Sequence, residues 1–435
     1  MGRWICDRLV ELLVAVSLIV TGCSDELEVM DTRADSVQPD SDYRPGKGDS
    51  TQVNRDECGP FPNDYFEYLD DTKCTKVIPT QRDREFTCPT EHSSPHVHGT
   101  STDQSHTYRP AADAPEVDSD ALVGLVPDDM NITVILVRRV NGEPHYRYLS
   151  NGTHDVIIQP WSSTKFMAVA NAGAALRKAS DGALGLTATV DSLPIGDLST
   201  IVHNYDEQRF TSNGLARWFL NIGTRTQLDH LIHEGWLQRS QDETLGGNYG
   251  HPSAAVGTYF IGEAGRIEMP GDDGNGPENQ LSTYTIAEFL KRLVMHRENP
   301  RYAMPHLQWP DVQTLLYGSA NSVLFEDEQP QGMESDPTVY LQNAIDTAAI
   351  ERAAQGQWRI FSKLGFGYSR GGEFVNAGYA CLPVLDEQGQ PTLNLGREFF
   401  IVSQLQAHRK YHETDRLIAE TYRHIISGIR SGAIQ

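Results

Sequence analysis

Basic residues are scarce in this chain. It holds 36 lysines and arginines against 59 aspartates and glutamates, which gives a formal net charge of −23 over 435 residues. Nucleic-acid binding needs a basic surface, so this balance argues against it. Hydrophobic residues make up 39% of the chain, enough for a globular core and too few for a membrane protein. We find no internal repeat, and no bilayer-length apolar run follows the N-terminal segment.

The first 22 residues have the features of an export signal. Arg3 and Arg8 precede a short apolar stretch, and small residues lead to Gly22-Cys23. A cysteine directly after Gly22 resembles the bacterial lipobox, which implies a signal peptide over 1–22 and a lipid on Cys23. The alternative is an ordinary secretory signal with an incidental cysteine. Ser24 is similar to the outer-membrane sorting pattern of enteric bacteria, so the predicted location is the bacterial envelope, anchored by lipid to the outer membrane.

Export also determines how the remaining cysteines are interpreted. The four that follow the anchor are Cys58, Cys74, Cys88 and Cys381. In an oxidising compartment they predict two disulfides, with three connectivities open, or one bridge and two free thiols.

Composition divides the chain into four parts. After the signal, residues 23–57 are polar and aperiodic, which predicts a flexible tether. Residues 58–120 form a polar, cysteine-containing segment, which predicts a small stapled unit or a disulfide-pinned arm. This segment holds four histidines, and we favour a solvated loop over a metal site for them: His92, His96, His98 and His106. Residues 121–435 form the main domain.

The periodicity of the main domain predicts an α+β fold. Two strands joined by an Asn141-Gly142 turn come first, and three strands and a helix over 414–429, capped by Thr414, come last. The predicted strands are 132–137, 146–149, 358–366, 373–384 and 398–405. Between them lie helical patterns at 162–178, 213–222, 227–237, 286–295, 312–317 and 339–354. Strands segregated from helices predict an antiparallel five-stranded sheet flanked by helices, with an inserted helical subdomain.

The first candidate motif is Ser162-Ser163-Thr164-Lys165, which begins an alanine-rich apolar segment. On a helix, Ser162 and Lys165 lie three residues apart and share a face. Burial disfavours the charge of a lysine, so a buried lysine can accept the proton of a serine hydroxyl and activate it as a nucleophile. The alternative is a helix cap with a surface lysine, which the apolar continuation argues against.

Two further motifs follow. Thr211-Ser212-Asn213 offers a hydroxyl and an amide two residues apart in a loop that enters a helix, although for this motif alone a plain N-cap is the favoured interpretation. Lys363-Leu364-Gly365 lies in a predicted strand, where a lysine beside an open edge could hold a substrate carboxylate. The alternative there is a strand-end lysine that faces solvent. The chain has only eight lysines, and two of them, Lys165 and Lys363, fall in the first and third motifs.

The three motifs together resemble those of the penicillin-recognising serine hydrolases, the class A β-lactamases and D,D-peptidases, over about residues 125–435. The resemblance implies a β-lactamase/transpeptidase-like fold, an acyl-enzyme on Ser162, no cofactor and no metal. It implies Lys165 as the activating base, Thr211 as proton relay, Asn213 as a contact of substrate and of Lys165, and Lys363 as a source of positive potential. Gly365 and Phe366 would border the substrate, with an oxyanion hole formed by the backbone N–H groups of Ser162 and Phe366.

Several positions depart from the family pattern. Thr211 replaces a serine, and Leu364 replaces a threonine or serine that helps to hold the substrate carboxylate. The Glu-x-x-Leu-Asn element that activates the deacylating water is matched only by 242–246, where Glu243 or Asp242 would be the base and Gly246 stands in place of the asparagine. A long spacing between the second and third motifs implies an insertion, for which 246–276 is a candidate.

Three functions remain open on the sequence. The first is a lipid-anchored serine hydrolase that acts on an amide or ester, such as a peptidoglycan peptide or a β-lactam. The second is a catalytically degenerate envelope protein that binds or supports other components. The third is a glutaminase, against which the export signal argues.

Overall fold

The fold is described from a computed structural model, over residues 78–98, 105–205, 209–249, 253–271, 276–326, 329–336, 345–367, 373–405 and 411–435. These all belong to one unit, Gln52–Gln435. The predictions for the signal, the lipid on Cys23, the tether, Cys58 and Cys74 lie outside the described residues. No helix in the described part of the chain is long and apolar enough to cross a membrane.

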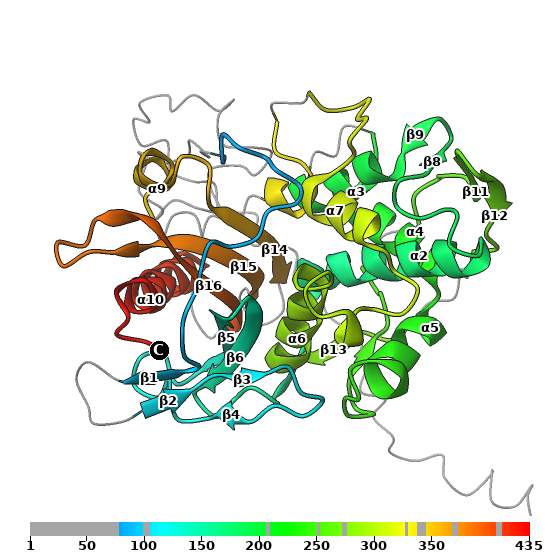
Figure 1. Ribbon diagram of the computed structural model, residues 1–435. Helices are drawn as coiled ribbons and strands as arrows, with labels where there is room; N and C mark the ends of the chain where they lie inside the picture. The colour runs from blue at the N-terminus through cyan, green and yellow to red at the C-terminus, as the bar shows by residue number, and fades with distance from the viewer. Residues whose placement is uncertain are drawn as a thin grey trace, which may run out of the picture. The chain divides into compact units, whose positions relative to one another are not determined.

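The centre of the fold is an antiparallel sheet, and its five long strands are those predicted (Figure 1). Their order is β14 (Arg359–Gly367), β15 (Glu373–Leu385), β16 (Pro391–Leu405), β5 (Met130–Val140) and β6 (Glu143–Ser150). Asn141 and Gly142 close the β5–β6 hairpin with φ of 53° and 82°, the left-handed values that an Asn-Gly turn adopts. The α+β prediction is therefore confirmed for the sheet.

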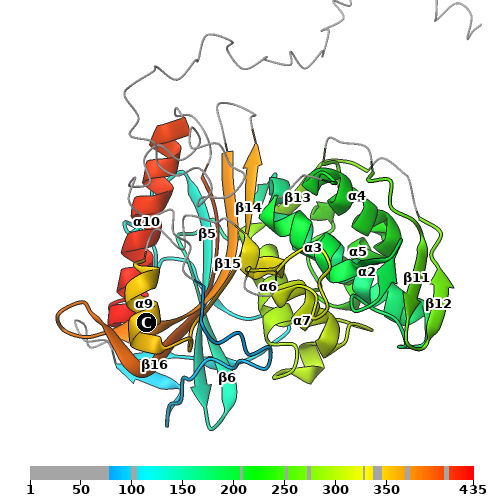
Figure 2. The ribbon, with the colours of Figure 1, turned by 90° about the horizontal axis from the view of Figure 1, so that it is seen from above.

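Side chains alternate across this sheet between two cores. Ile135 and Val137 pack with the helical subdomain, whereas Val134 and Leu136 pack with the helices on the other face. That other face is covered by α9 (Thr347–Ala354) and α10 (Tyr411–Ser431), and Figure 2 shows the sheet between the two groups of helices.

The helical subdomain lies between β6 and β14 in the chain, as predicted. It comprises α2 (Lys165–Ala179), α3 (Ile195–Asn204), α4 (Ser212–Gly223), α5 (Arg225–His230), η4 (Leu231–Gly235), α6 (Thr283–Val294), η5 (Pro300–Tyr302), α7 (Trp309–Tyr317) and η6 (Gly332–Ser335). Two small sheets support it: β7 (Ile157–Ile158), β10 (Thr244–Leu245) and β13 (Asn279–Ser282), and β8 (Thr189–Val190), β9 (Leu193–Pro194), β11 (Tyr259–Gly262) and β12 (Gly265–Glu268). The β11–β12 hairpin occupies part of the predicted insertion.

Three helices differ from the predictions. Of the helix predicted over 339–354, the described part begins at Thr347, after the N-cap Asp346, and residues 339–344 lie outside the described residues. Helix α3 was not predicted, although its apolar residues Ile195, Leu198 and Ile201 recur at helical spacing; the polar residues between them are buried as well. Helix α10 begins at Tyr411, three residues before the predicted cap at Thr414. Its continuation toward the N-terminus carries the polar sequence Tyr-His-Glu, which has no apolar periodicity to indicate a helix.

The N-terminal arm adds to the sheet. Strand β3 (Arg109–Pro110) pairs antiparallel with β6, and β4 (Val117–Asp118) pairs parallel with it, so the sheet has seven strands among the described residues. Part of the predicted histidine-rich loop is a strand, because β1 (His96–His98) pairs with β2 (Ser105–Thr107). No cluster of three or more metal-ligating side chains occurs within the described ranges.

A disulfide joins this arm to the sheet. Cys88 is bonded to Cys381 of β15, 293 residues away in sequence. Both cysteines are buried, and Gly396 of β16 lies against the two sulfurs, where a Cβ would come within 2.9 Å of Cys88 Sγ. The prediction of at least one bridge is thus confirmed, and the arm is the disulfide-pinned one.

We expect the loss of this bridge to destabilise the protein. Removing a native disulfide typically lowers the free energy of unfolding by about 2–5 kcal/mol. Urea denaturation of a Cys88→Ser, Cys381→Ser double variant should show a decrease in this range, and a reductant should bring the wild type close to the variant. Two free thiols at these positions in the oxidised, denatured protein would refute the pairing.

Candidate active site

Ser162 lies in η3 (Trp161–Thr164), a single 3-10 turn that leads directly into α2. It is half-buried, and it is the one motif hydroxyl without a hydrogen bond to any residue that the structure describes. By contrast, Ser163 Oγ donates to Pro160 O at 2.6 Å and Thr164 Oγ1 donates to Trp161 O at 3.3 Å. The predicted nucleophile is therefore the hydroxyl that is not held by the protein.

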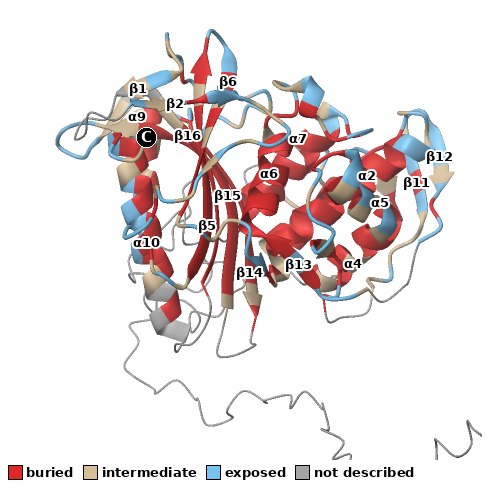
Figure 3. Ribbon diagram, turned by 90° about the horizontal axis from the view of Figure 1, so that it is seen from below, coloured by how far each residue is buried: buried red, intermediate tan, exposed pale blue. Residues whose placement is uncertain are grey.

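Lys165 is fully buried at the start of α2, a helix whose residues are almost all buried (Figure 3). Its Nζ donates to Ser212 Oγ at 2.9 Å and to Asn213 Oδ1 through a short hydrogen bond. The rings of Tyr205 and Tyr249 lie 5.3 and 5.6 Å from Nζ. The structure thus brings the first and second motifs together, with Asn213 bonded to Lys165 as predicted.

The hydroxyl beside Lys165 belongs to Ser212 and not to Thr211. Thr211 is exposed, and its Oγ1 accepts from Gly214 N at 3.0 Å as the N-cap of α4. Ser212 is buried and also donates to Val202 O at 2.8 Å. The predicted relay role of Thr211 is therefore corrected. Its side chain caps α4, and the hydroxyl that reaches Lys165 is that of the next residue, Ser212.

Strand β14 passes directly over the start of η3. A Cβ on Gly365 would lie 2.5 Å from Pro160 O, 2.7 Å from Ser163 N and 3.1 Å from Ser162 N. Only glycine allows this approach, which places the backbone of the third motif beside the N–H of Ser162. The next residue, Phe366, is half-buried with its ring 4.9 Å from that of Phe374.

Lys363 lies on β14 and is also fully buried. It forms an ion pair with Asp336, at 3.0 Å between Nζ and Oδ2, and neither side chain is exposed. Burial lowers the pKa of Lys363 to about 8, although the Asp336 carboxylate opposes that shift. The sequence predicts Lys363 as a source of positive potential for an anionic substrate. Its contacts do not favour that role, because the Asp336 carboxylate already offsets the charge of the Lys363 ammonium group.

The candidate deacylation bases are engaged elsewhere. Glu243 is buried, and its carboxylate accepts from Arg239 Nε at 3.2 Å and from Ser282 N at 2.9 Å. Asp242 is exposed and bonds only to Ser240 among the described residues. The Glu243 contacts fix the start of α6, and they do not favour Glu243 as a base, because a carboxylate held by a guanidinium and a helix N-cap residue is a structural partner.

His203 of α3 is a buried group near the site that the motifs did not indicate. Its Nδ1 lies 2.7 Å from Ser199 O, and its Nε2 has no hydrogen bond with any residue that the structure describes. Burial and the charges of Lys363 and Lys165 lower its pKa to about 3. The ring is therefore neutral in the folded protein at any pH at which the protein is expected to work.

This histidine should make the protein sensitive to acid. Between pH 6.5 and 3 the unfolded chain binds a proton at His203 and the folded chain does not, so stability falls as the pH falls. From the ordinary histidine pKa, the loss between pH 7 and pH 5 is about 2 kcal/mol. Chemical denaturation at pH 7 and at pH 5 should show that the free energy of unfolding decreases by about 2 kcal/mol more in the wild type than in His203→Asn. The exposed His424→Asn serves as control and should keep the wild-type difference; an unchanged difference in His203→Asn would contradict the assignment.

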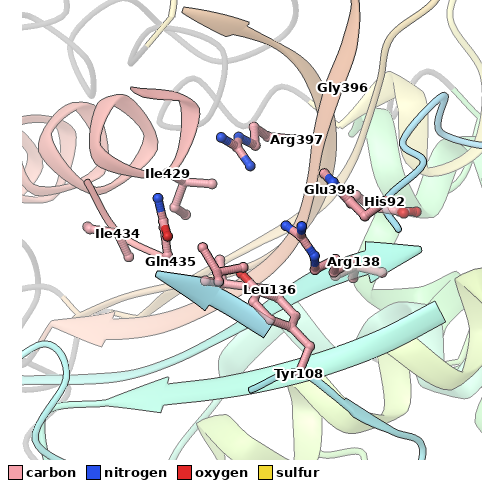
Figure 4. Close-up of a pocket in the computed structure, with 12 residues that line it drawn as sticks. His92, Tyr108, Leu136, Arg138, Gly396, Arg397, Glu398, Ile429, Ile434 and Gln435 are labelled. Atoms are coloured by element: carbon pink, nitrogen blue, oxygen red, sulfur yellow. The ribbon is translucent and has the colours of Figure 1, made fainter. Parts of the chain in front are cut away.

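A separate pocket lies on the other side of the sheet, and none of the predicted site residues lines it. It is formed by the arm, β5, β16 and the end of the chain, and Figure 4 shows Arg138 and Arg397 directed into it beside Gln435. No serine, threonine or cysteine is among the residues that line it, so we do not place the chemistry there.

Comparison with known proteins gives structural matches only. No family model matches the chain, and no curated protein matches its sequence. Among solved structures, a variant of the last common ancestor of Gram-negative bacteria class A β-lactamases is 15% identical, with a TM-score of 0.39 over 69% of this chain and 92% of that one. PBP-A is 13% identical, with a TM-score of 0.37 over 69% and 89%. A mutant of the chromosome-encoded β-lactamase of Vibrio parahaemolyticus is 12% identical, with a TM-score of 0.37 over 68% and 94%. The matched proteins belong to the class that the motifs resemble, and the likeness is one of fold alone.

Proposed function

We propose that this chain is a serine hydrolase that forms an acyl-enzyme on Ser162. The observation that carries the proposal is a half-buried serine, bonded to no described residue, that lies three residues before a fully buried lysine whose Nζ is held by Ser212 and Asn213. A surface lysine or a simple helix cap would need neither the burial nor the two oriented partners.

The proposed reaction follows from this arrangement. In its neutral form, Lys165 accepts the proton of Ser162 as Oγ attacks the carbonyl carbon of an amide or ester. The N–H groups of Ser162 and Phe366 stabilise the oxyanion, which is why β14 must lie against η3. Lys165 then returns the proton to the leaving amine or alcohol, with Ser212 within hydrogen-bond distance to relay it, and water later hydrolyses the acyl-enzyme. Peptidoglycan peptides and β-lactams are candidate substrates by resemblance.

Deacylation is the slower step in this proposal. The Glu243 carboxylate is already bonded to Arg239 and to Ser282 N, which makes it a poor base for water, and Asp242 is exposed with a bond to Ser240. A fluorophosphonate or an acylating ester should therefore leave a persistent adduct on the peptide that contains Ser162, seen by mass spectrometry. A folded protein that resists all such probes would favour the alternative, a non-catalytic binding protein of the envelope.

We also propose that the protein is exported and held at a bacterial membrane by lipid on Cys23. The support is the signal-like segment that ends in Gly22-Cys23, together with a disulfide in the folded part, which oxidising compartments favour. Fractionation should find the wild type with membranes and Cys23→Ser in the soluble fraction or with its signal uncleaved. Equal solubility of the two forms would refute the anchor.

A further inference from the structure

The ammonium group of Lys363 has no hydrogen-bond donor left for a ligand. A lysine has three N–H donors. In the structure they meet Asp336 Oδ2 at 3.0 Å, Leu364 O at 3.2 Å and the hydroxyl of Tyr205 through a short bond. All three acceptors belong to the protein, so a substrate carboxylate could bind Lys363 only by displacing one of them.

Tyr205 closes this position from the side of the subdomain. Its ring centroid lies 3.7 Å from Lys363 Nζ, and its hydroxyl donates to Leu364 O at 2.8 Å. The tyrosine follows α3 directly and has a φ of 58°, a left-handed conformation that turns the chain at the end of the helix. The ring and hydroxyl of Tyr205 thus cover the Lys363 ammonium group on the side of the helical subdomain.

Asp336 removes the net charge. Its Oδ2 accepts from Lys363 Nζ and from Leu364 N at 3.1 Å, and its Oδ1 lies 3.4 Å from Ser362 Oγ. The pair is fully buried, so solvent does not screen it and the two charges offset each other locally. Leu364 has no hydroxyl to offer a substrate carboxylate, and its side chain packs into the core on the α9 and α10 face.

We propose that the leaving-group side of this site accepts an uncharged group, so that the substrate is an ester or amide without a carboxylate beside the scissile bond. This inference rests on the proposed function and narrows its substrates: it excludes the peptidoglycan peptides and β-lactams named there whose leaving group carries a carboxylate. The Ser162 Oγ–carbonyl bond forms, the bond to the leaving oxygen or nitrogen breaks, and the leaving group departs as a neutral alcohol or amine with the proton taken from Ser162. No step requires an anion to be held by Lys363.

Two esters that differ only in charge test the inference. They are phenyl phenylacetate and its 3-carboxyphenyl analogue, which carries a carboxylate on the leaving group. The wild type should hydrolyse the neutral ester with a kcat/KM at least about tenfold higher than that for the carboxylated ester. The carboxylate is desolvated on binding and gains no charge-assisted hydrogen bond in return. Asp336→Asn and Tyr205→Phe should each reduce this preference, since one restores the net charge and the other frees a donor. Tyr259→Phe, on an exposed hairpin, should keep the wild-type ratio.

The outcomes separate the inference from the function beneath it. Equal or faster reaction of the carboxylated ester with the wild type, with the adduct on Ser162, overturns the inference and leaves the hydrolase standing. Failure of both esters and of a fluorophosphonate to modify Ser162 overturns the hydrolase, and the inference with it. The ratio of kcat/KM for the two esters in the wild type tests the inference even if the Asp336→Asn variant does not fold.

Discussion

Replacing Ser162 by alanine should abolish labelling by a fluorophosphonate and all ester turnover, while the protein stays folded. The hydroxyl is half-buried and bonds to no described residue, so its removal leaves no buried group without a partner and should change stability little. Ser163→Ala is the matched control. It removes the neighbouring hydroxyl, which bonds to Pro160 O, and should retain labelling. Labelling at another serine, with Ser162→Ala fully active, would refute the site.

Lys165→Ala should reduce the rate of acylation nearly as far. General base catalysis typically contributes about 10²–10⁴-fold, so the loss should lie in that range. Lys178→Ala, on the exposed end of the same helix, is the control and should keep the wild-type rate. An active Lys165→Ala variant would show that the serine is activated by a different group, even if Ser162 is the nucleophile.

The second large effect concerns Gly365. Its Cα lies so close to η3 that a methyl group would meet three backbone atoms, Pro160 O, Ser163 N and Ser162 N, none of which can turn aside. Gly365→Ala should therefore push β14 away from η3 and misalign the proposed oxyanion hole. Loss of one oxyanion donor costs about 10²–10³-fold in kcat, and we expect Gly365→Ala to fall in that range.

A second glycine provides the control for this variant. A Cβ at Gly271 would meet no atom closer than 3.9 Å, and the residue has no left-handed φ, so Gly271→Ala should keep both activity and stability. The expected signature of Gly365→Ala is a lowered kcat in a folded protein. Wild-type kinetics for Gly365→Ala would show that β14 does not contribute to the reaction, and would leave Ser162 and Lys165 to be judged separately.

Local patterns in the sequence were sufficient for the main architecture. The five long strands and most helices were predicted because β-branched runs, an Asn-Gly turn and helical periodicity are properties of neighbouring residues. The same holds for the setting of two lysines: Lys165 starts an apolar helix and Lys363 lies within an apolar strand. Helix α3 was not predicted, because polar residues such as Asp197 and Ser199 interrupt its short apolar pattern and only the fold shows that they are buried.

Only the tertiary structure decided which groups meet. Thr211 and Ser212 are adjacent hydroxyls, and the cap geometry of α4 determines that Ser212, not Thr211, reaches Lys165. Asp336 pairs with Lys363 across 27 residues and has no motif of its own. Cys88 pairs with Cys381 because the arm passes over β15 and β16, two inner strands of the sheet. The sequence by itself determined the local elements and the residues able to do acyl transfer, since these depend on short-range preferences. The partners that neutralise, cap or cover those residues depend on long-range packing, which spacing along the chain does not encode.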